Sequence, residues 1–122
     1  MRVLAMTTAV LIALAAVVTP AQAATISRAD LIARAKMWLT ANNGGPVPYS
    51  QSSFWGSEGY RQDCSGYVSM AAKLGAPGQR TVELYDTYST AISAKDLQWG
   101  DIVVDPNGTD GYYPRKLRNV TG

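Results

Sequence analysis

The N-terminal segment constrains this chain most, because it leaves only residues 24–122 of the 122-residue sequence for the fold. A basic start at Met1-Arg2 is followed by an apolar run over Val3–Val18 and by Ala21-Gln22-Ala23, an A-x-A cleavage pattern. These features are typical of a secretory signal peptide, and the apolar run is shorter than the ~20 residues of a membrane span. We therefore predict a signal peptide over residues 1–23, a secreted bacterial protein, extracellular or associated with the cell wall, and no stable membrane anchor after cleavage.

The charge balance of the mature chain bears on its partners. The full sequence has 11 basic and 9 acidic side chains, and cleavage removes only Arg2 from the basic set. The near-neutral balance that remains leads us to expect no nucleic-acid partner. A late basic cluster at Arg115, Lys116 and Arg118 is more typical of a solvated tail than of a binding patch.

Two helices are predicted from their start and stop signals. The first begins near Ser27, which can cap it with Asp30 in the capping-box position, and its apolar residues recur at helical spacing. Glycine and proline in Asn43-Gly44-Gly45-Pro46 end this helix. The second helix begins after Asp63 and runs to about Leu74.

The elements predicted beyond the second helix are short. Thr81–Tyr88 allows a helical turn, and Ile102–Val104 has the composition of a strand. Asp105–Gly108 has strong turn chemistry, and we predict no strand or helix after it. The strand at Ile102–Val104 is therefore expected to be an exposed edge with few partners.

A loop over Val47–Gln62 separates the two predicted helices and is rich in aromatic residues. It shows neither the helical nor the strand period of apolar residues. Phe54 and Trp55 can cover a core, or they can line a cleft, and the sequence leaves both interpretations open.

Cys64 is the single cysteine of the sequence, so it cannot form an internal disulfide. It is a buried structural thiol, one half of an intermolecular bridge, or a reactive nucleophile. Asp63 is a good N-cap, and backbone N–H groups in the first turn of the helix that follows favour a thiolate. Gly66 allows another segment of chain to approach closely. These features alone do not decide among the three interpretations.

Three segments together resemble the NlpC family (NlpC and p-sixty) of papain-like cell-wall cysteine peptidases. Residues Gly59–Ala71 resemble its nucleophile motif Asp-Cys-Ser-Gly-aromatic-Val, as found in the secreted actinobacterial branch. Pro48-Tyr49 resembles an upstream Pro-Tyr element, and Leu97–Val103 resembles a Gly-Asp segment in which Trp99 replaces the usual proline. The resemblance implies an α+β, papain-like NlpC-type fold that acts on peptidoglycan stem peptides.

The resemblance also implies roles for individual residues. Cys64 is expected to be the nucleophile, and its backbone N–H and the Tyr49 hydroxyl to hold the oxyanion. Asp63 and Ser65 are expected to contact the substrate peptide. The alternatives are a helix cap for Asp63 and a hydroxyl that satisfies a first-turn amide for Ser65. Neither a metal nor a cofactor is implied.

The family's catalytic base is missing, because the sequence contains no histidine. In the family a histidine lies on a strand shortly after the Gly-Asp segment, but here Asn107–Arg118 has no such pattern. We therefore predict an incomplete fold, with a partial peptidase domain over residues 24–108 and a divergent tail over residues 109–122. The N-terminal helices are retained and the C-terminal antiparallel sheet is largely missing.

Weak or absent turnover is expected without a base, since general acid–base help is typically worth 10²–10⁴-fold. The chain is then either a truncated or frame-shifted gene fragment, or a non-catalytic module that binds the cell wall. A third possibility is a small exported protein whose cysteine is buried and inert.

Overall fold

The computed structural model describes residues 24–109 and 111–122, so the predicted signal peptide lies outside the described residues. The helices in this part of the chain are α1 (Arg28–Met37), α2 (Cys64–Ala71), α3 (Thr81–Asp86) and a short 3-10 helix (Ala94–Asp96). The strands are β1 (Ile26–Ser27), β2 (Phe54–Trp55), β3 (Tyr60–Arg61), β4 (Ser89–Ala91), β5 (Ile102–Val104), β6 (Tyr113–Leu117) and β7 (Val120–Thr121). This small mixed domain of helices and short strands is compatible with the predicted α+β class.

The helix α1 starts as its sequence predicts but ends earlier. The Ser27 hydroxyl accepts a hydrogen bond from the Asp30 backbone N–H at 3.1 Å, which satisfies one of the free amides of the first turn. The helix ends at Met37, and the residues that follow form turns. Asn43 and Gly44 both have positive φ angles. The residues predicted to end the helix therefore form a turn that lies beyond it.

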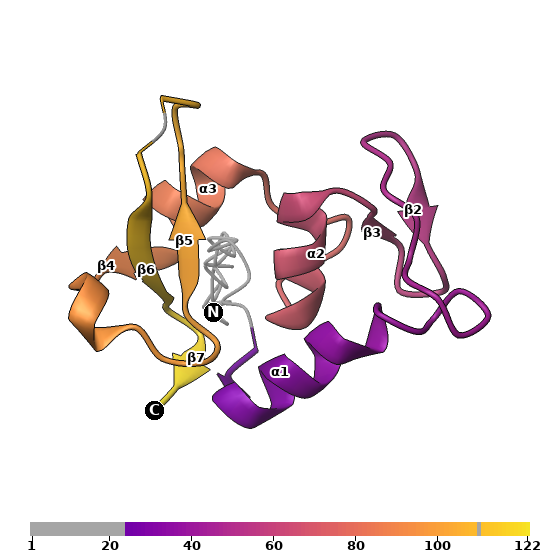
Figure 1. Ribbon diagram of the computed structural model, residues 1–122, viewed down its shortest axis with the longest axis horizontal. Helices are drawn as coiled ribbons and strands as arrows, with labels where there is room; N and C mark the ends of the chain where they lie inside the picture. The colour runs from indigo at the N-terminus through magenta and orange to yellow at the C-terminus, as the bar shows by residue number, and fades with distance from the viewer. Residues whose placement is uncertain (1–23, 110) are drawn as a thin grey trace, which may run out of the picture.

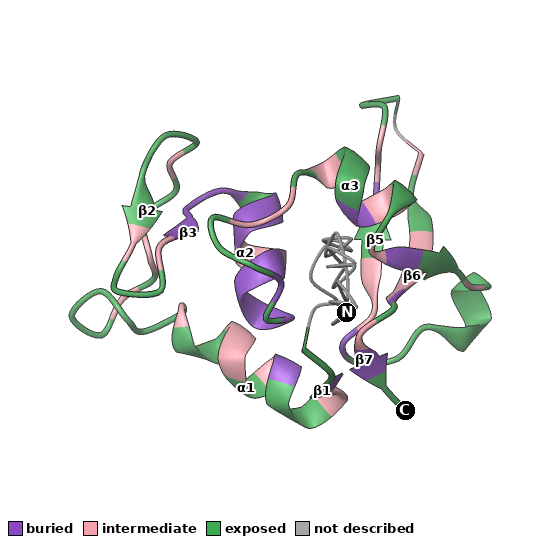
Figure 2. Cartoon of the chain, turned by 180° about the vertical axis from the view of Figure 1, so that it is seen from behind, coloured by how far each residue is buried: buried purple, intermediate pink, exposed green. Residues whose placement is uncertain are grey.

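The helix α2 packs beside α1 and is the more buried of the two (Figures 1 and 2). The Tyr67 hydroxyl donates to the carbonyl of Ala35 at 2.8 Å, and the rings of Tyr67 and Trp38 lie 5.7 Å apart. Nε of Arg34 donates to the carbonyl of Met70 at 2.8 Å. These contacts bind the two helices to each other along their length.

A three-stranded antiparallel sheet, in the order β4-β6-β5, lies beside the helices (Figure 1). The prediction that no strand follows Asn107 is therefore wrong, and the predicted loss of most of the C-terminal sheet is corrected by this finding. β6 is the central strand and pairs Leu117 with Ser89 on one side and Arg115 with Ile102 on the other. The edge position predicted for β5 agrees with this order.

The strand β6 is hidden in the sequence because only its last residue is a buried aliphatic side chain. Leu117 is almost fully buried, whereas Pro114 and the charged residues beside it are unusual in a central strand. Pro114 has no N–H to donate, but it lies where the pairing with β4 has ended at Ala91, and its carbonyl still accepts a bond from the Ile92 N–H at 3.2 Å. The charged side chains of Arg115 and Lys116 form hydrogen bonds within the protein.

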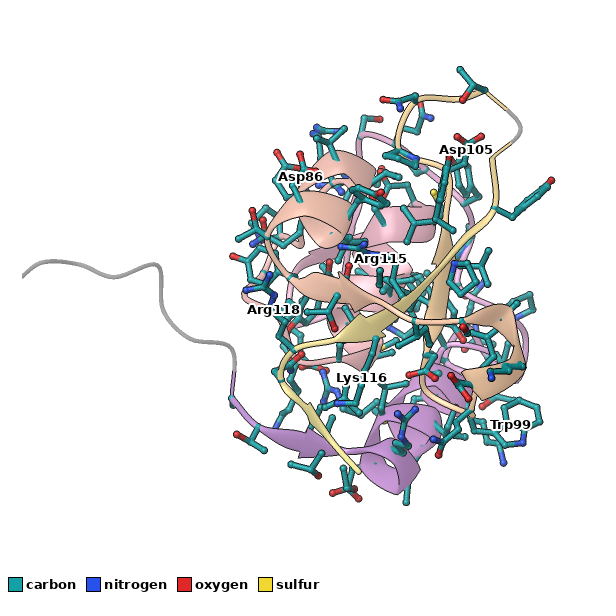
Figure 3. All side chains as sticks on the ribbon, turned by 90° about the vertical axis from the view of Figure 1, so that its left-hand side faces the viewer. Asp86, Trp99, Asp105, Arg115, Lys116 and Arg118 are labelled. Carbon is teal, nitrogen blue, oxygen red and sulfur yellow. The ribbon has the colours of Figure 1, made fainter. Side chains whose placement is uncertain are left out.

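Arg115 shows how the basic cluster differs from the solvated tail that the sequence predicts (Figure 3). Its guanidinium lies 4.1 Å from the centre of the Tyr85 ring. Nη2 of Arg115 donates to the Tyr85 carbonyl at 2.7 Å, and Nε donates to the Ser89 hydroxyl at 3.0 Å. Arg115 therefore joins β6 to the end of α3 and to β4.

The two ends of the described chain meet, because β1 and β7 form a parallel pair. Beside them, Arg28 donates to the Asp101 carboxylate at 2.7 Å, to the Trp99 carbonyl at 3.0 Å and to the Gly122 carbonyl at 2.8 Å. The segment that resembles the family's Gly-Asp element therefore closes the domain through Arg28. Within the described residues, no helix is both long and apolar enough to span a membrane.

The hydrophobic core lies between the helices and the sheet and includes residues from both ends of the described chain. Its buried side chains are Ile26, Leu31, Tyr60, Met70, Ala71, Ala72, Leu74, Leu84, Leu117 and Val120. Because Met70 and Ala71 of α2 and Ala72 and Leu74 directly after it belong to this core, the helix that carries Cys64 is held in place.

Candidate functional site

Cys64 is the first residue of α2, and its free thiol is exposed. The structure therefore excludes a buried cysteine at this position. At the start of an eight-residue helix, backbone N–H groups without helical partners favour a negative charge. The position suits a nucleophile, which must be both exposed and favoured as a thiolate.

The residues on both sides of Cys64 are buried, namely Tyr60, Arg61, Gln62, Asp63 and Ser65. Nε of Arg61 donates to Oδ2 of Asp63 at 2.6 Å, and its Nη2 donates to the Ser65 hydroxyl at 3.0 Å. The Ser65 hydroxyl donates in turn to Oδ1 of Asp63 at 3.4 Å. Cys64 is thus the exposed residue in a segment whose other side chains hold the helix start together.

Asp63 caps the helix α2, which was the alternative to a substrate contact in the sequence analysis. Its Oδ1 accepts a hydrogen bond from the Gly66 N–H at 2.8 Å. Burial alone would raise the pKa of Asp63, but the hydrogen bonds from Arg61 and from the Gly66 N–H outweigh it and lower the pKa below its usual value. Asp63 is therefore a charged cap, and a contact between Asp63 and a substrate stays a prediction.

Ser65 lies inside the domain rather than toward a ligand. Its hydroxyl is shared between Arg61 and Asp63, so it does not satisfy a first-turn amide as the alternative proposed. A contact between this buried side chain and a substrate peptide also stays a prediction.

Gly66 allows β3 to cross close to the first turn of α2. A Cβ atom at this position would overlap the carbonyl oxygen of Arg61 and lie 2.9 Å from Oδ1 of Asp63. The close approach predicted for Gly66 is therefore made by the protein's own backbone. It brings Arg61 within reach of Asp63 and Ser65.

Tyr49 and Cys64 lie on the same small cleft, which has a volume of about 230 Å³. The main chain of Pro48 is tied to the nucleophile segment, because Nε2 of Gln62 donates to the Pro48 carbonyl at 2.8 Å. The Tyr49 side chain is 66% exposed, and its hydroxyl accepts a hydrogen bond from Nε2 of Gln51 at 3.2 Å. The cleft is lined by Trp38, Leu39, Pro46, Val47, Tyr49, Gln62, Asp63, Cys64 and Tyr67.

The titratable groups of this cleft do not offer a base for the thiol. The sequence contains no histidine, and Asp63 is held as the charged partner of Arg61. Burial raises the pKa of Tyr67, whose hydroxyl already donates to the Ala35 carbonyl. The described cleft can present a thiol to a ligand, but it holds no group suited to carry a proton at neutral pH.

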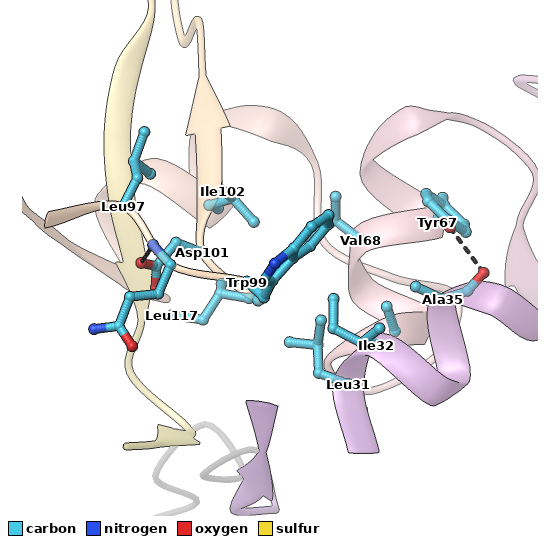
Figure 4. Close-up of a pocket in the computed structure, with 13 residues that line it drawn as sticks. Leu31, Ile32, Ala35, Tyr67, Val68, Leu97, Trp99, Asp101, Ile102 and Leu117 are labelled. Atoms are coloured by element: carbon cyan, nitrogen blue, oxygen red, sulfur yellow. Dashed lines mark hydrogen bonds between the residues drawn. The ribbon is translucent and has the colours of Figure 1, made fainter. Parts of the chain in front are cut away.

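A larger groove of about 560 Å³ lies between the helices and the sheet (Figure 4). It is lined mainly by apolar side chains, including Leu31, Val68 and Leu117, and Trp99 belongs to its wall while being 84% exposed. Tyr67 lines both this groove and the Cys64 cleft. Asp101 is the acidic residue that lines the groove, and its carboxylate forms an ion pair with Arg28.

Sequence reasoning identified Cys64 and Tyr49 but not the supporting residues Arg61, Gln62 and Trp38. A signal for Arg61 was present, since an arginine two residues before an N-cap aspartate is a plausible partner for that carboxylate. Gln62 gave no such signal, because its bond to the Pro48 carbonyl depends on how the loop folds back.

Comparisons with known proteins identify no relative of this chain. No protein-family model matches it, and no curated protein or solved structure is significantly similar to it. Membership of the NlpC family and the papain-like fold therefore stay predictions from the sequence motifs.

Proposed function

We propose that this chain is a secreted cysteine-peptidase-type domain of the NlpC family that presents Cys64 to peptidoglycan stem peptides. The observation that carries the proposal is the contrast between Cys64, which is exposed, and its neighbours on both sides, which are buried. An arrangement of this kind fixes the main chain and leaves one thiol free to reach a substrate. The shared cleft with Tyr49 supports the same proposal.

The first chemical step needs Cys64 as the thiolate, and because the cleft holds no base for the thiol, its proton goes to water. The sulfur of Cys64 attacks the amide carbon, a C–S bond forms, and the carbonyl oxygen takes a negative charge. The backbone N–H of Cys64 and the Tyr49 hydroxyl are the proposed donors to that oxygen. Collapse of this intermediate restores the C=O bond, breaks the C–N bond, releases the amine once it gains a proton, and leaves the acyl group on sulfur as a thioester.

The second requirement is a proton for the departing amine, and the cleft has no positioned side chain to donate it. The family uses a histidine, which this sequence lacks, and Asp63 is engaged by Arg61 and Gly66. Loss of general acid–base help typically costs 10²–10⁴-fold in rate. We therefore propose a reactive thiol with weak or absent turnover.

Two measurements on residues 24–122 test this proposal. Alkylation of Cys64 by iodoacetamide is expected to be fast at neutral pH, because the thiol is exposed at the first residue of α2. Incubation with purified muropeptides, followed by mass spectrometry, is expected to show little or no cleavage. Slow alkylation that accelerates only at alkaline pH would refute the nucleophile role. Efficient cleavage that is lost in Cys64→Ala would refute the claim of weak turnover.

A non-catalytic cell-wall-binding module is the second candidate function. The observation that favours it is the exposure of aromatic side chains on the loop between α1 and α2, with Tyr49 66% and Phe54 57% exposed. This candidate predicts that the protein sediments with insoluble peptidoglycan and that Cys64→Ala sediments equally well. Sedimentation that requires Cys64 would favour the peptidase-type domain instead.

A further inference from the structure

A second hollow, of about 390 Å³, lies between the end of α1 and the β2–β3 hairpin. We call it the Trp55 hollow. Its aromatic side chains are Trp38, Trp55 and Tyr60, and its polar side chains are Thr40, Ser57 and Glu58. Trp38 also lines the Cys64 cleft, so the two hollows adjoin.

Glu58 supplies this hollow with an anchored carboxylate. Its Oε2 accepts a hydrogen bond from Nη2 of Arg34 at 2.8 Å, and Arg34 is itself fixed by the Met70 carbonyl. Oε1 of Glu58 makes no hydrogen bond within the described residues, and the side chain is 48% exposed. One carboxylate oxygen is therefore held in place and free to accept a hydrogen bond from a ligand.

We infer that the Trp55 hollow binds a neutral saccharide, of one or two pyranose rings. A pyranose has a C–H face that packs on the electron-rich face of an aromatic ring, and hydroxyls at its edge that donate to a carboxylate. Trp38 and Trp55 provide the first kind of contact and Glu58 the second. The volume lies in the range of small-ligand pockets, and the combination of apolar walls with few polar groups is typical of them.

The charges of the hollow favour a neutral ligand over a charged one. Arg34 beside Glu58 opposes a cation, and Glu58 opposes an anion. A purely aliphatic ligand would bury the free oxygen of Glu58 without a hydrogen bond, which is costly. A neutral polyhydroxyl ligand has no charge for Arg34 or Glu58 to repel, and its hydroxyls can donate to the free oxygen of Glu58. The inference goes beyond the proposed function, since it needs no reaction at Cys64.

Tryptophan fluorescence offers a direct test, because the sequence contains three tryptophans and two of them line the hollow. The third, Trp99, is 84% exposed and lines the larger groove, so Trp99→Phe gives a background in which the signal comes from Trp38 and Trp55. Residues 24–122 with this change are titrated with the tetramer of N-acetylglucosamine. We expect a saturable change in emission, with a dissociation constant of about 1 mM or tighter.

Four variants in this background locate the binding. Trp55→Ala is expected to weaken binding at least tenfold, and Glu58→Gln to weaken it severalfold. Tyr112→Ala is the control, because Tyr112 is an aromatic side chain that is 79% exposed and does not line the hollow. Tyr112→Ala and Cys64→Ala are both expected to bind the tetramer as the background protein does.

The inference is overturned by any of four results. One is the absence of a saturable change at about 10 mM tetramer, far above the expected dissociation constant. Another is unchanged binding in Trp55→Ala, or loss of binding in Cys64→Ala with the circular dichroism unchanged. The last is an equal response to an N-acetylated stem tripeptide, which would assign the hollow to peptide instead of saccharide. Cleavage or its absence at Cys64 affects none of these results.

Discussion

Arg61 and Asp63 form a buried ion pair at the start of α2, with Nε and Oδ2 2.6 Å apart. Asp63 also caps the helix through the Gly66 N–H, so one carboxylate both joins β3 to the helix and satisfies an amide of its first turn. Cys64 lies directly after this carboxylate. The position of the thiol therefore depends on an ion pair that takes no part in the proposed chemistry.

Replacing Arg61 is expected to destabilise the domain strongly. Arg61→Ala leaves the buried Asp63 carboxylate without its partner, and breaking one side of a buried ion pair typically costs about 3–5 kcal/mol. Urea unfolding followed by circular dichroism measures this loss. Arg80→Ala is the matched control, because Arg80 is exposed and makes no side-chain cap bond, and we expect a change below about 0.5 kcal/mol there. Equal effects of the two substitutions would contradict the role given to Arg61.

The stability of the domain is expected to fall in acid partly through Asp63. Because the folded protein lowers the pKa of Asp63 below its unfolded value of about 3.9, the unfolded state binds the proton more readily. The contribution of Asp63 is therefore fully present above that value and is lost as the pH falls through the lower folded pKa.

The measurement for Asp63 is the difference in unfolding free energy between the wild type and Asp63→Asn, taken from pH 7 to pH 2. We expect a difference that is constant near neutral pH and shrinks below about pH 4, where the carboxylate becomes protonated. A difference that stays constant over the whole range would show that the charge of Asp63 does not stabilise the fold.

Adding a methyl group at Gly66 is expected to separate β3 from α2. A Cβ atom there overlaps the Arg61 carbonyl, which is main chain and cannot swing aside as a side chain can. Overpacking of this kind typically costs about 1–3 kcal/mol, and Gly66→Ala is also expected to slow or alter the alkylation of Cys64. Gly75→Ala is the control, since a Cβ at Gly75 meets nothing within 4 Å. Wild-type stability in Gly66→Ala would contradict the close approach.

The strand β6 is tested through Leu117, which is 1% exposed. Leu117→Ala removes a buried side chain from the core, and such substitutions typically cost about 2–5 kcal/mol. Val103→Ala on the neighbouring strand β5 is the control, because the Val103 side chain is half-exposed, and we expect it to be milder. Thermal unfolding of both variants measures the difference. A mild effect at Leu117 would support the original prediction of a divergent tail without strands.

The helix starts could be predicted from the sequence because their signals are local. Ser27 and Asp63 each accept a bond from an amide three residues later, and this geometry needs no other part of the chain. The helix ends were predicted three or more residues too late, at Asn43 and Leu74, because glycine and proline act as readily in a following turn as in a helix cap.

The sheet was not predictable in the same way. The pairing of β6 with β4 and β5 joins residues that lie from nine to 28 positions apart, and proline and charged residues conceal the pattern of β6. The aromatic side chains of the loop between α1 and α2 also lie in different surroundings, which the sequence did not predict. Trp55 lines its own hollow, Tyr49 lines the Cys64 cleft, and Phe54 is exposed.

The amino-acid sequence alone establishes that a single cysteine follows an aspartate suited to cap a helix and that no histidine is present to act as its base. Both are facts of composition and local order, which need no fold. The exposure of Cys64 between buried neighbours, and the pairing of Arg61 with Asp63, follow from the folded structure. Burial and long-range contacts depend on how distant segments pack, and no short motif specifies that packing.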